Sequence, residues 1–128
     1  MSAKVLIADD ELYILESVSY VVRSAGMTPL TAEDGQEALR LAETEKPDLI
    51  ILDVMLPKLS GLQVCQRLRE NPLTRAVPIL MLSARGQESD EAQGRRSGAD
   101  DYMTKPFSPR RLKTRIEEMV LHHEPADG

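Results

Sequence analysis

The stretch DLIILD, at residues 48–53, indicates the fold class of this chain. Its four central residues are all apolar, without the apolar–polar alternation that marks a strand exposed on one face. Such a run is typical of a β-strand in a parallel sheet, which helices cover on both faces. The stretch ends at a charged residue, Asp53. We therefore expect a buried strand that delivers a carboxylate to the edge of a sheet.

The segments around this strand repeat the pattern. Apolar runs predict strands at residues 4–8, 27–32, 48–53, 77–83 and 101–104. Helices are expected between and after them, at residues 12–25, 35–45, in the segment after Gly61, at 86–97 and at 108–121. Pro29 places the second strand at an edge. This alternation predicts an α/β fold, a doubly wound (βα)5 three-layer sandwich around a five-stranded parallel sheet.

The composition limits the classes of function. With 128 residues the chain fits one domain, which we place at residues 1–122, with 123–128 as a flexible tail or the start of a linker. The formal net charge of −5 argues against direct nucleic-acid binding by this domain. The apolar runs are too short to span a bilayer and no export signal is visible, so we expect a cytoplasmic protein without membrane contact. A lone cysteine, Cys65, excludes an internal disulfide bond.

Polar residues stand at the carboxyl ends of four predicted strands. They are, in chain order, Asp9 and Asp10, Asp53, Ser83 and Lys105. Taken singly, each has an ordinary explanation, since Asp and Ser often cap helices or close turns and lysines are usually solvated. Ligands of open parallel α/β sheets, however, bind at the carboxyl ends of the strands. Together these side chains therefore predict a site at that edge.

Three carboxylates in one place need a cation. Two like charges 4 Å apart repel by about 1 kcal/mol in water and by about 4 kcal/mol at an effective dielectric constant near 20. The candidate ligands are all oxygen atoms, which favours Mg²⁺ or Mn²⁺ over zinc. An ion held by few carboxylates also binds phosphate oxygens, and a neighbouring carboxylate can attack phosphorus. The residues therefore predict phosphoryl transfer, with Lys105 and Ser83 assisting.

Four motifs resemble the receiver domain of two-component response regulators. They are VLIADDE (5–11), DLIILDVMLPKLSGL (48–62), PILMLSA (78–84) and GADDYMTKPF (98–107). The resemblance spans about residues 4–121. It implies a flavodoxin-like fold with strand order 2-1-3-4-5. The longer stretch GADDYMTKPFSPRRL is similar to receivers of winged-helix transcriptional regulators.

The resemblance implies roles for the acidic residues. Asp53 corresponds to the aspartate that accepts the phosphoryl group. Asp10, Asp53 and the backbone carbonyl of Met55 would hold Mg²⁺ or Mn²⁺, with Asp9 acting through a water molecule. Lys105 would pair with the phosphoryl group, and the bond between Lys105 and Pro106 is expected to be cis.

Further roles follow from the same resemblance. Ser83 would bond a phosphoryl oxygen and act with the aromatic residue Tyr102 as a conformational switch. Met55 and Arg85, each two residues beyond a site residue, would tune the lifetime of the phosphoryl group. The segment 86–97 is strongly polar, and we expect it to be the softest helix of the domain.

The resemblance also implies partners. The phosphoryl donor would be a sensor histidine kinase or a phosphotransfer protein, and the signal would pass to an output domain or a downstream protein. A homodimer is possible through the face formed by 86–97, 101–104 and 108–121. That face carries mixed charges, which fit either a dimer or an ordinary surface: Arg95, Arg96, Asp100, Asp101, Arg111 and Arg115.

Three other readings remain open. A phosphohydrolase of the haloacid dehalogenase type also forms an aspartyl phosphate, but it has a second Asp two residues after the nucleophile, where this chain has Met55. A flavodoxin-like cofactor module needs a phosphate-binding loop after the first strand, where this chain has acids. A pseudo-receiver that works without phosphorylation would not need the full set of acids, hydroxyl and lysine. We expect a signalling domain rather than an enzyme; the cognate kinase and the controlled process are not encoded in these motifs.

Overall fold

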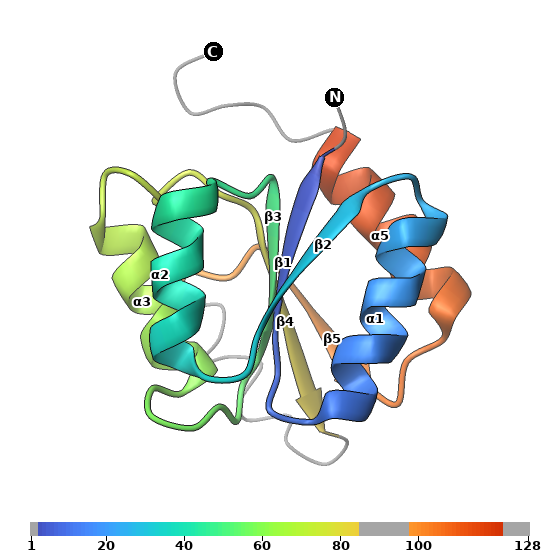
Figure 1. Cartoon of the computed structure of the whole chain (residues 1–128), viewed down its shortest axis with the longest axis horizontal. Coiled ribbons are helices and arrows are strands. Elements are labelled where there is room, and N and C mark those ends of the chain that lie inside the picture. Colours follow the sequence, from blue (N-terminus) through green and yellow to red (C-terminus); the bar gives the residue numbers. More distant parts are fainter. Residues whose placement is uncertain (1–2, 85–97, 122–128) are drawn as a thin grey trace.

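The structure is a five-stranded parallel sheet between two layers of helices (Figure 1). It is a computed structural model that describes residues 3–84 and 98–121. The strands are β1 Lys4–Ala8, β2 Thr28–Ala32, β3 Leu49–Asp53, β4 Ile79–Ala84 and β5 Asp101–Lys105. They lie in the order β2-β1-β3-β4-β5, and all neighbours are parallel. The predicted fold class and strand order are confirmed.

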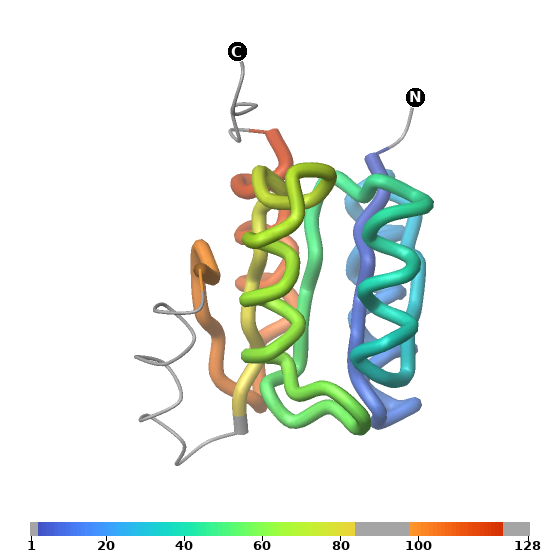
Figure 2. The backbone as a smooth tube through the Cα atoms, turned by 90° about the vertical axis from the view of Figure 1, so that its left-hand side faces the viewer, coloured from blue at the N-terminus to red at the C-terminus, as the bar shows by residue number. Residues whose placement is uncertain are grey.

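Helices cover both faces of the sheet. The described helices are α1 Leu12–Ser24, α2 Gly35–Glu45, α3 Gly61–Glu70 and α5 Pro109–Leu121. In Figure 1, α1 and α5 lie on one side of the sheet and α2 and α3 on the other. Figure 2 looks onto the layer of α2 and α3, with the strands behind it. The helix predicted at 86–97 lies outside the described residues.

Each face of the sheet has its own hydrophobic core. All five residues of β3 are buried, as its unbroken apolar run predicts. Ile50 and Leu52 join the core beneath α2 and α3, whereas Leu49 and Ile51 join the core beneath α1 and α5. In β2, by contrast, Ala32 is the one buried residue, because this is an outermost strand with a neighbour on one side only. The central position of β3 fixes Asp53 in the middle of the sheet's carboxyl edge.

The start of α3 is pressed against the end of β3. Ser60 and Gln63 form a reciprocal capping box at the first turn of α3. The Gly61 N–H donates to the Val54 carbonyl at 2.8 Å. A Cβ atom at Gly61 would collide with the backbone carbonyl of Asp53. Glycine is therefore needed here so that the helix can approach the strand that carries Asp53.

The carboxyl ends of the strands meet at one edge of the sheet, which we call the acidic edge. The strand register aligns Ala8 with Leu52, Asp53 with Leu82 and Ala84 with Lys105. The opposite edge, where the strands begin and α5 ends, is called the amino edge (Figure 1). Among the residues that the structure describes, no helix is both long and apolar enough to cross a membrane.

Candidate functional site

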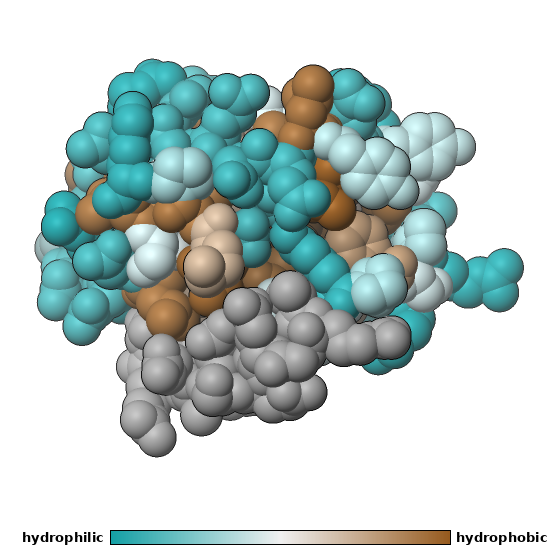
Figure 3. All heavy atoms as spheres, turned by 90° about the horizontal axis from the view of Figure 1, so that it is seen from below, coloured by the Kyte–Doolittle hydropathy of each residue, from teal (hydrophilic) through white to brown (hydrophobic). Residues whose placement is uncertain are grey.

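Three carboxylates converge at the acidic edge. Asp9 and Asp10 follow β1, and Asp53 ends β3, the strand paired with β1. One carboxylate oxygen from each lies within 4.8 Å of the others. Asp9 and Asp53 are buried, whereas Asp10 is exposed. Figure 3 looks onto this edge and shows hydrophilic residues lying between hydrophobic ones. The cluster thus combines two desolvated acids with one that opens to water.

The ammonium of Lys105 lies among these acids. Its Nζ atom is 2.9 Å from Asp9 Oδ2 and 3.5 Å from Asp53 Oδ1. Glu11 Oε1 is 3.8 Å from the same nitrogen, although the Glu11 side chain is largely exposed. The Lys105–Pro106 peptide bond is cis, as expected. The carboxylates of Asp9, Asp53 and Glu11 therefore share the single positive charge of Lys105, which leaves the site with excess negative charge.

Burial and charge shift the titration of this cluster. Burial and then the neighbouring Asp9 carboxylate raise the pKa of Asp53 from 3.8 to about 6. Burial lowers the pKa of Lys105, but the hydrogen bond to Asp9 and the nearby carboxylates outweigh it, so the pKa is raised. At neutral pH Asp53 is thus mostly ionised and Lys105 is fully charged.

Backbone hydrogen bonds hold the acids in place. Asp9 donates its N–H to the Ala32 carbonyl at 3.1 Å, and its Oδ1 accepts the Glu11 N–H at 2.9 Å. Asp53 Oδ1 accepts the Met55 N–H at 3.3 Å. The N-cap of α1 is Glu11, and no side chain caps this helix. The ordinary explanation that Asp9 or Asp10 caps the helix is therefore wrong. The backbone hydrogen bond expected if Asp53 closes a turn is present, since its carboxylate accepts the Met55 N–H.

The other predicted site residues lie around this cluster. Ser83 is buried in β4, directly after Leu82, which is aligned with Asp53. Met55 is exposed beside the acids. Tyr102 is half-buried in β5 and packs against the core under α2 and α3. Arg85 lies outside the described residues. The edge of the sheet therefore brings the acids, Lys105 and Ser83 to one end of the molecule.

Glu11 lies in the acidic run that ends the first strand motif, but the sequence analysis gave it no role in the site. It approaches Lys105 because α1 begins immediately after the acidic turn that follows β1. The available signal was the run of three acids at residues 9–11, directly after an apolar strand. Its role as a third partner of Lys105 depends on the distance between the ends of β1 and β5, which the sequence does not contain.

The residues present fit a hard divalent cation. The converging side chains offer carboxylate oxygens, which Mg²⁺ and Mn²⁺ prefer. The exposed position of Asp10 gives an ion access from water, and the excess negative charge favours its binding. Asp9, Asp10 and Asp53 together could hold such an ion.

Charges predicted for a dimer face partly pair within the chain. Arg115 of α5 pairs with Asp101 at the start of β5. Asp100 accepts from Arg69 of α3 at 2.8 Å. Arg95 and Arg96 lie outside the described residues. Both acids named for dimerisation, Asp100 and Asp101, therefore already have partners in the single chain.

Curated relatives match almost the entire chain. It is 51% identical over 124 residues to the alkaline phosphatase synthesis transcriptional regulatory protein PhoP of Bacillus subtilis, covering 97% of this chain and 51% of that protein. It is 42% identical over 125 residues to the phosphate regulon transcriptional regulatory protein PhoB of Escherichia coli, covering 98% and 55%. The chain thus spans about half the length of the curated relatives it matches.

Solved structures agree with this match. The receiver domain of the Francisella response regulator 1452 superposes with a TM-score of 0.87 at 34% identity, covering 96% of this chain and 100% of that one. The chemotaxis response regulator CheY4 of Vibrio cholerae gives a TM-score of 0.87 at 33% identity, covering 94% and 100%. The family model described as response regulator receiver domain matches residues 5–117. The chain therefore belongs to the family of response regulator receiver domains of two-component signal transduction.

Proposed function

We propose that this domain accepts a phosphoryl group on Asp53 from the phosphohistidine of a sensor histidine kinase or a phosphotransfer protein. The observation that carries the proposal is the position of Asp53, buried beside Asp9 and the Lys105 ammonium at the acidic edge. A carboxylate in this place is ionised at neutral pH and is held by the Met55 N–H. It is thus available as a nucleophile.

The transfer is a single displacement at phosphorus. An oxygen of Asp53 forms a bond to phosphorus while the bond between phosphorus and the donor imidazole nitrogen breaks, and that nitrogen keeps the electron pair. Lys105 lies close enough to Asp53 to pair with the incoming phosphoryl oxygens, and Ser83 is expected to donate its hydroxyl hydrogen to one of them. The chain's own contribution is therefore mainly positioning and charge neutralisation.

A bound Mg²⁺ or Mn²⁺ would supply positive charge for the oxygens of the transferring group. Asp10, Asp53 and the backbone carbonyl of Met55 are proposed to hold it, with Asp9 completing the acidic set. Met55 and Arg85 would tune how fast water reaches the aspartyl phosphate. Met55 supports this role because its side chain is exposed next to Asp53.

Phosphorylation is proposed to shift the domain between two conformations. Ser83 would move toward the phosphoryl group, and Tyr102 would turn inward on the neighbouring strand β5. The readout would occur at the surface made by residues 86–97, β5 and α5, either through a homodimer or through an output domain or downstream protein. The same proposal places the protein in the cytoplasm and the end of the receiver domain near residue 122. It also includes slow dephosphorylation of Asp53 that the domain itself promotes.

Chemical phosphorylation tests the proposal directly. With Mg²⁺ and acetyl phosphate, the intact mass should increase by one phosphoryl group, and hydroxylamine should remove it. Asp53→Asn should abolish the increase, whereas Glu70→Gln, an exposed acid at the end of α3, should leave it unchanged. Absence of any adduct contradicts the proposal. Repeated turnover of unrelated phosphomonoesters would favour the phosphohydrolase instead.

A further inference from the structure

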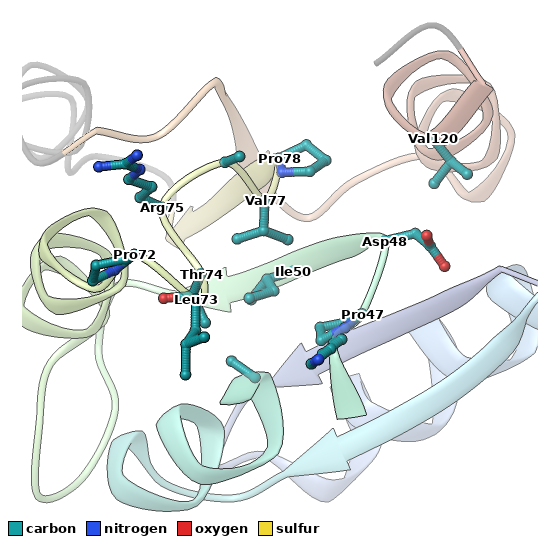
Figure 4. Close-up of a pocket in the computed structure, with 13 residues that line it drawn as sticks. Pro47, Asp48, Ile50, Pro72, Leu73, Thr74, Arg75, Val77, Pro78 and Val120 are labelled. Carbon is teal, nitrogen blue, oxygen red and sulfur yellow. The ribbon is translucent and has the colours of Figure 1, made fainter. Parts of the chain in front are cut away.

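The helix α2 connects the two edges of the sheet. Its C-terminal part lines a cavity of about 550 Å³ at the amino edge, together with the loop 72–78 and Val120 (Figure 4). Its first residue, Gly35, lies at the acidic edge, because α2 begins just after β2 has ended there (Figure 1). None of the residues assigned to phosphoryl transfer belongs to α2, yet the start of this helix contacts the loop that follows Asp53.

That loop, residues 54–60, leads from Asp53 to α3. Figure 2 shows it in green at the lower end of α3, from where it extends toward α2. Its first residue, Val54, is buried and donates its N–H to the Leu82 carbonyl of β4 at 3.0 Å. The next residue, Met55, is 62% exposed. The chain therefore leaves the sheet directly after Val54, and the rest of the loop needs support from another element.

The start of α2 supports the loop through the backbone. The Gly35 N–H donates to the Pro57 carbonyl at 3.2 Å, and the same carbonyl accepts the Leu59 N–H at 2.7 Å. A Cβ atom at residue 35 would collide with both the carbonyl oxygen and the Cβ atom of Leu59. The loop backbone thus packs directly against the helix, with no room for a side chain between them.

An ion pair reinforces the same contact. Lys58 Nζ lies 3.4 Å from Oδ2 of Asp34, the N-cap of α2, whose Oδ1 accepts the Glu37 N–H at 2.8 Å. The Lys58 backbone has φ 69°, in the left-handed region that residues with a side chain rarely adopt. Such a conformation persists where the surroundings impose it. The contact with α2 therefore constrains the loop at three successive residues, 57–59.

The constrained residues adjoin a proposed ligand of the divalent cation. Met55 is two residues before Pro57, and its backbone carbonyl is proposed to hold Mg²⁺ together with Asp10 and Asp53. The acids supply the attraction for the ion. A loop carbonyl adds most to binding when its direction is fixed before the ion arrives, because no ordering is then needed on binding. The support of the loop therefore bears on the affinity for the ion.

We propose that the start of α2 positions the loop 54–60, and with it the Met55 carbonyl, for the divalent cation. Gly35 and the pair of Asp34 with Lys58 are positioning residues, which act through the loop and not as ligands. This inference rests on the proposed function, since it uses the ion and the Met55 carbonyl assigned there. It adds residues 34–35, which lie outside all four receiver motifs, to the parts of the chain that shape the site.

Titration with Mg²⁺ without any phosphoryl donor tests the proposal, with the NMR shifts of backbone amides around Asp10 and Asp53 as the signal. Gly35→Ala should weaken Mg²⁺ binding about tenfold, because the new Cβ displaces the loop. Ala42→Gly is the matched control, since it also destabilises α2 but lies about two turns further along, at the amino edge. It should bind Mg²⁺ as the parent does. Unchanged affinity in Gly35→Ala, or equal weakening in both variants, would overturn the proposal.

Lys58→Gly is a second test that does not depend on the folding of Gly35→Ala. Glycine adopts φ 69° without strain, so this variant loses the ion pair with Asp34 and relieves the backbone. Removal of a positive charge from this edge favours Mg²⁺ binding by itself, whereas removal of the anchor weakens it. We expect binding about threefold weaker than in the parent. Unchanged or tighter binding would show that the anchor does not position the loop.

Phosphorylation by acetyl phosphate separates ion binding from the chemical step. Well below the parent's dissociation constant for Mg²⁺, Gly35→Ala should react about tenfold more slowly than the parent. At saturating Mg²⁺ the two rates should agree within about twofold, since excess ion restores occupancy. A deficit that persists at saturation would place the effect on the chemical step and contradict the proposal.

The same measurements distinguish this inference from the function on which it rests. If the parent binds Mg²⁺ and is phosphorylated on Asp53 while the variants bind Mg²⁺ equally well, the positioning role alone fails. If the parent neither binds Mg²⁺ nor becomes phosphorylated, the proposed function fails and the positioning role fails with it.

Discussion

Lys105 and Asp9 form a buried ion pair that joins the ends of two strands which are not neighbours. Nζ of Lys105 lies 2.9 Å from Oδ2 of Asp9, across 96 positions of sequence. β3 and β4 lie between β1 and β5, so the lysine side chain reaches back over the edge of both. Asp9 is fully buried, and this ammonium is the nearest cation to it among the described residues. Lys105 therefore offsets part of the negative charge of the acidic edge.

Lys105→Met should destabilise the domain strongly. The change leaves Asp9 and Asp53 buried without their cation, a loss that typically costs about 3 kcal/mol. Urea unfolding at pH 7.5 measures it. The matched control is Lys58→Met, because Lys58 pairs with Asp34 at 3.4 Å but is 58% exposed. That variant should lose less than about 1 kcal/mol. Equal losses of unfolding free energy in the two variants would show that the buried ion pair stabilises the domain no more than the exposed one.

Asp53→Asn should stabilise the metal-free protein at pH 7.5. The pKa of Asp53 is raised to about 6, so its carboxyl binds a proton more tightly in the folded than in the unfolded chain. Its contribution to stability therefore grows as the pH falls from about 7 toward 4 and is lost as the pH rises through 6. The Asn variant should gain about 2 kcal/mol over the parent at pH 7.5, and much less at pH 4.5. Urea unfolding at both pH values in EDTA measures this. A difference in the free energy of unfolding that is the same at both pH values would contradict the raised pKa of Asp53.

Mg²⁺ should stabilise the folded protein through the acidic cluster. At a concentration ten times the dissociation constant, binding adds about 1.4 kcal/mol to the free energy of unfolding. Asp10→Asn should weaken this effect, whereas Glu70→Gln, far from the cluster, should not. Mn²⁺ provides a second readout, because its paramagnetism should broaden the NMR signals of residues around Asp10 and Asp53. Broadening elsewhere would place the ion at a different site.

Gly61→Ala should damage both stability and phosphorylation. The new Cβ would collide with the carbonyl of Asp53, and relief of such overpacking typically costs about 2 kcal/mol. The shift of β3 should also slow modification of Asp53 by acetyl phosphate. Gly26→Ala is the control, because Gly26 has φ +78° but no atom within 4 Å of the new Cβ. It should cost about 1 kcal/mol and leave the phosphorylation rate unchanged. Equal phosphorylation rates in the two variants would show that the close contact of Gly61 with Asp53 does not affect the reaction.

The fold was predictable because local and global signals agree. The unbroken apolar run of β3 means burial on both faces, which a parallel sheet between helices provides. Pro29 in β2 is compatible with an edge position, and β2 is at the edge. The strand ends gave the approximate place of the acids, since parallel strands direct their carboxyl ends to the same side.

Details of the site depend on distances that the sequence does not contain. Two neighbouring acids, Asp9 and Asp10, look equivalent in the sequence, yet one is buried against Lys105 and the other is exposed. Neither of them is the N-cap of α1, which is Glu11. Asp9 instead accepts the Glu11 N–H through Oδ1 and pairs with Lys105 through Oδ2. The pairing of Asp101 with Arg115 likewise requires knowing how α5 packs beside β5.

Cys65 should resist alkylation in the native protein. The thiol is fully buried on α3, and burial raises its pKa to about 11. Thiolate is the reactive form, so almost none is present at pH 8, and reagent has no access. Iodoacetamide followed by intact-mass measurement should show no adduct in buffer and one in 6 M guanidinium chloride. Gln66→Cys places an exposed thiol one residue further along α3, and this variant should gain one adduct in the native state. Rapid native labelling of Cys65 itself would show that α3 separates from the sheet far more often than its buried face and capping box imply.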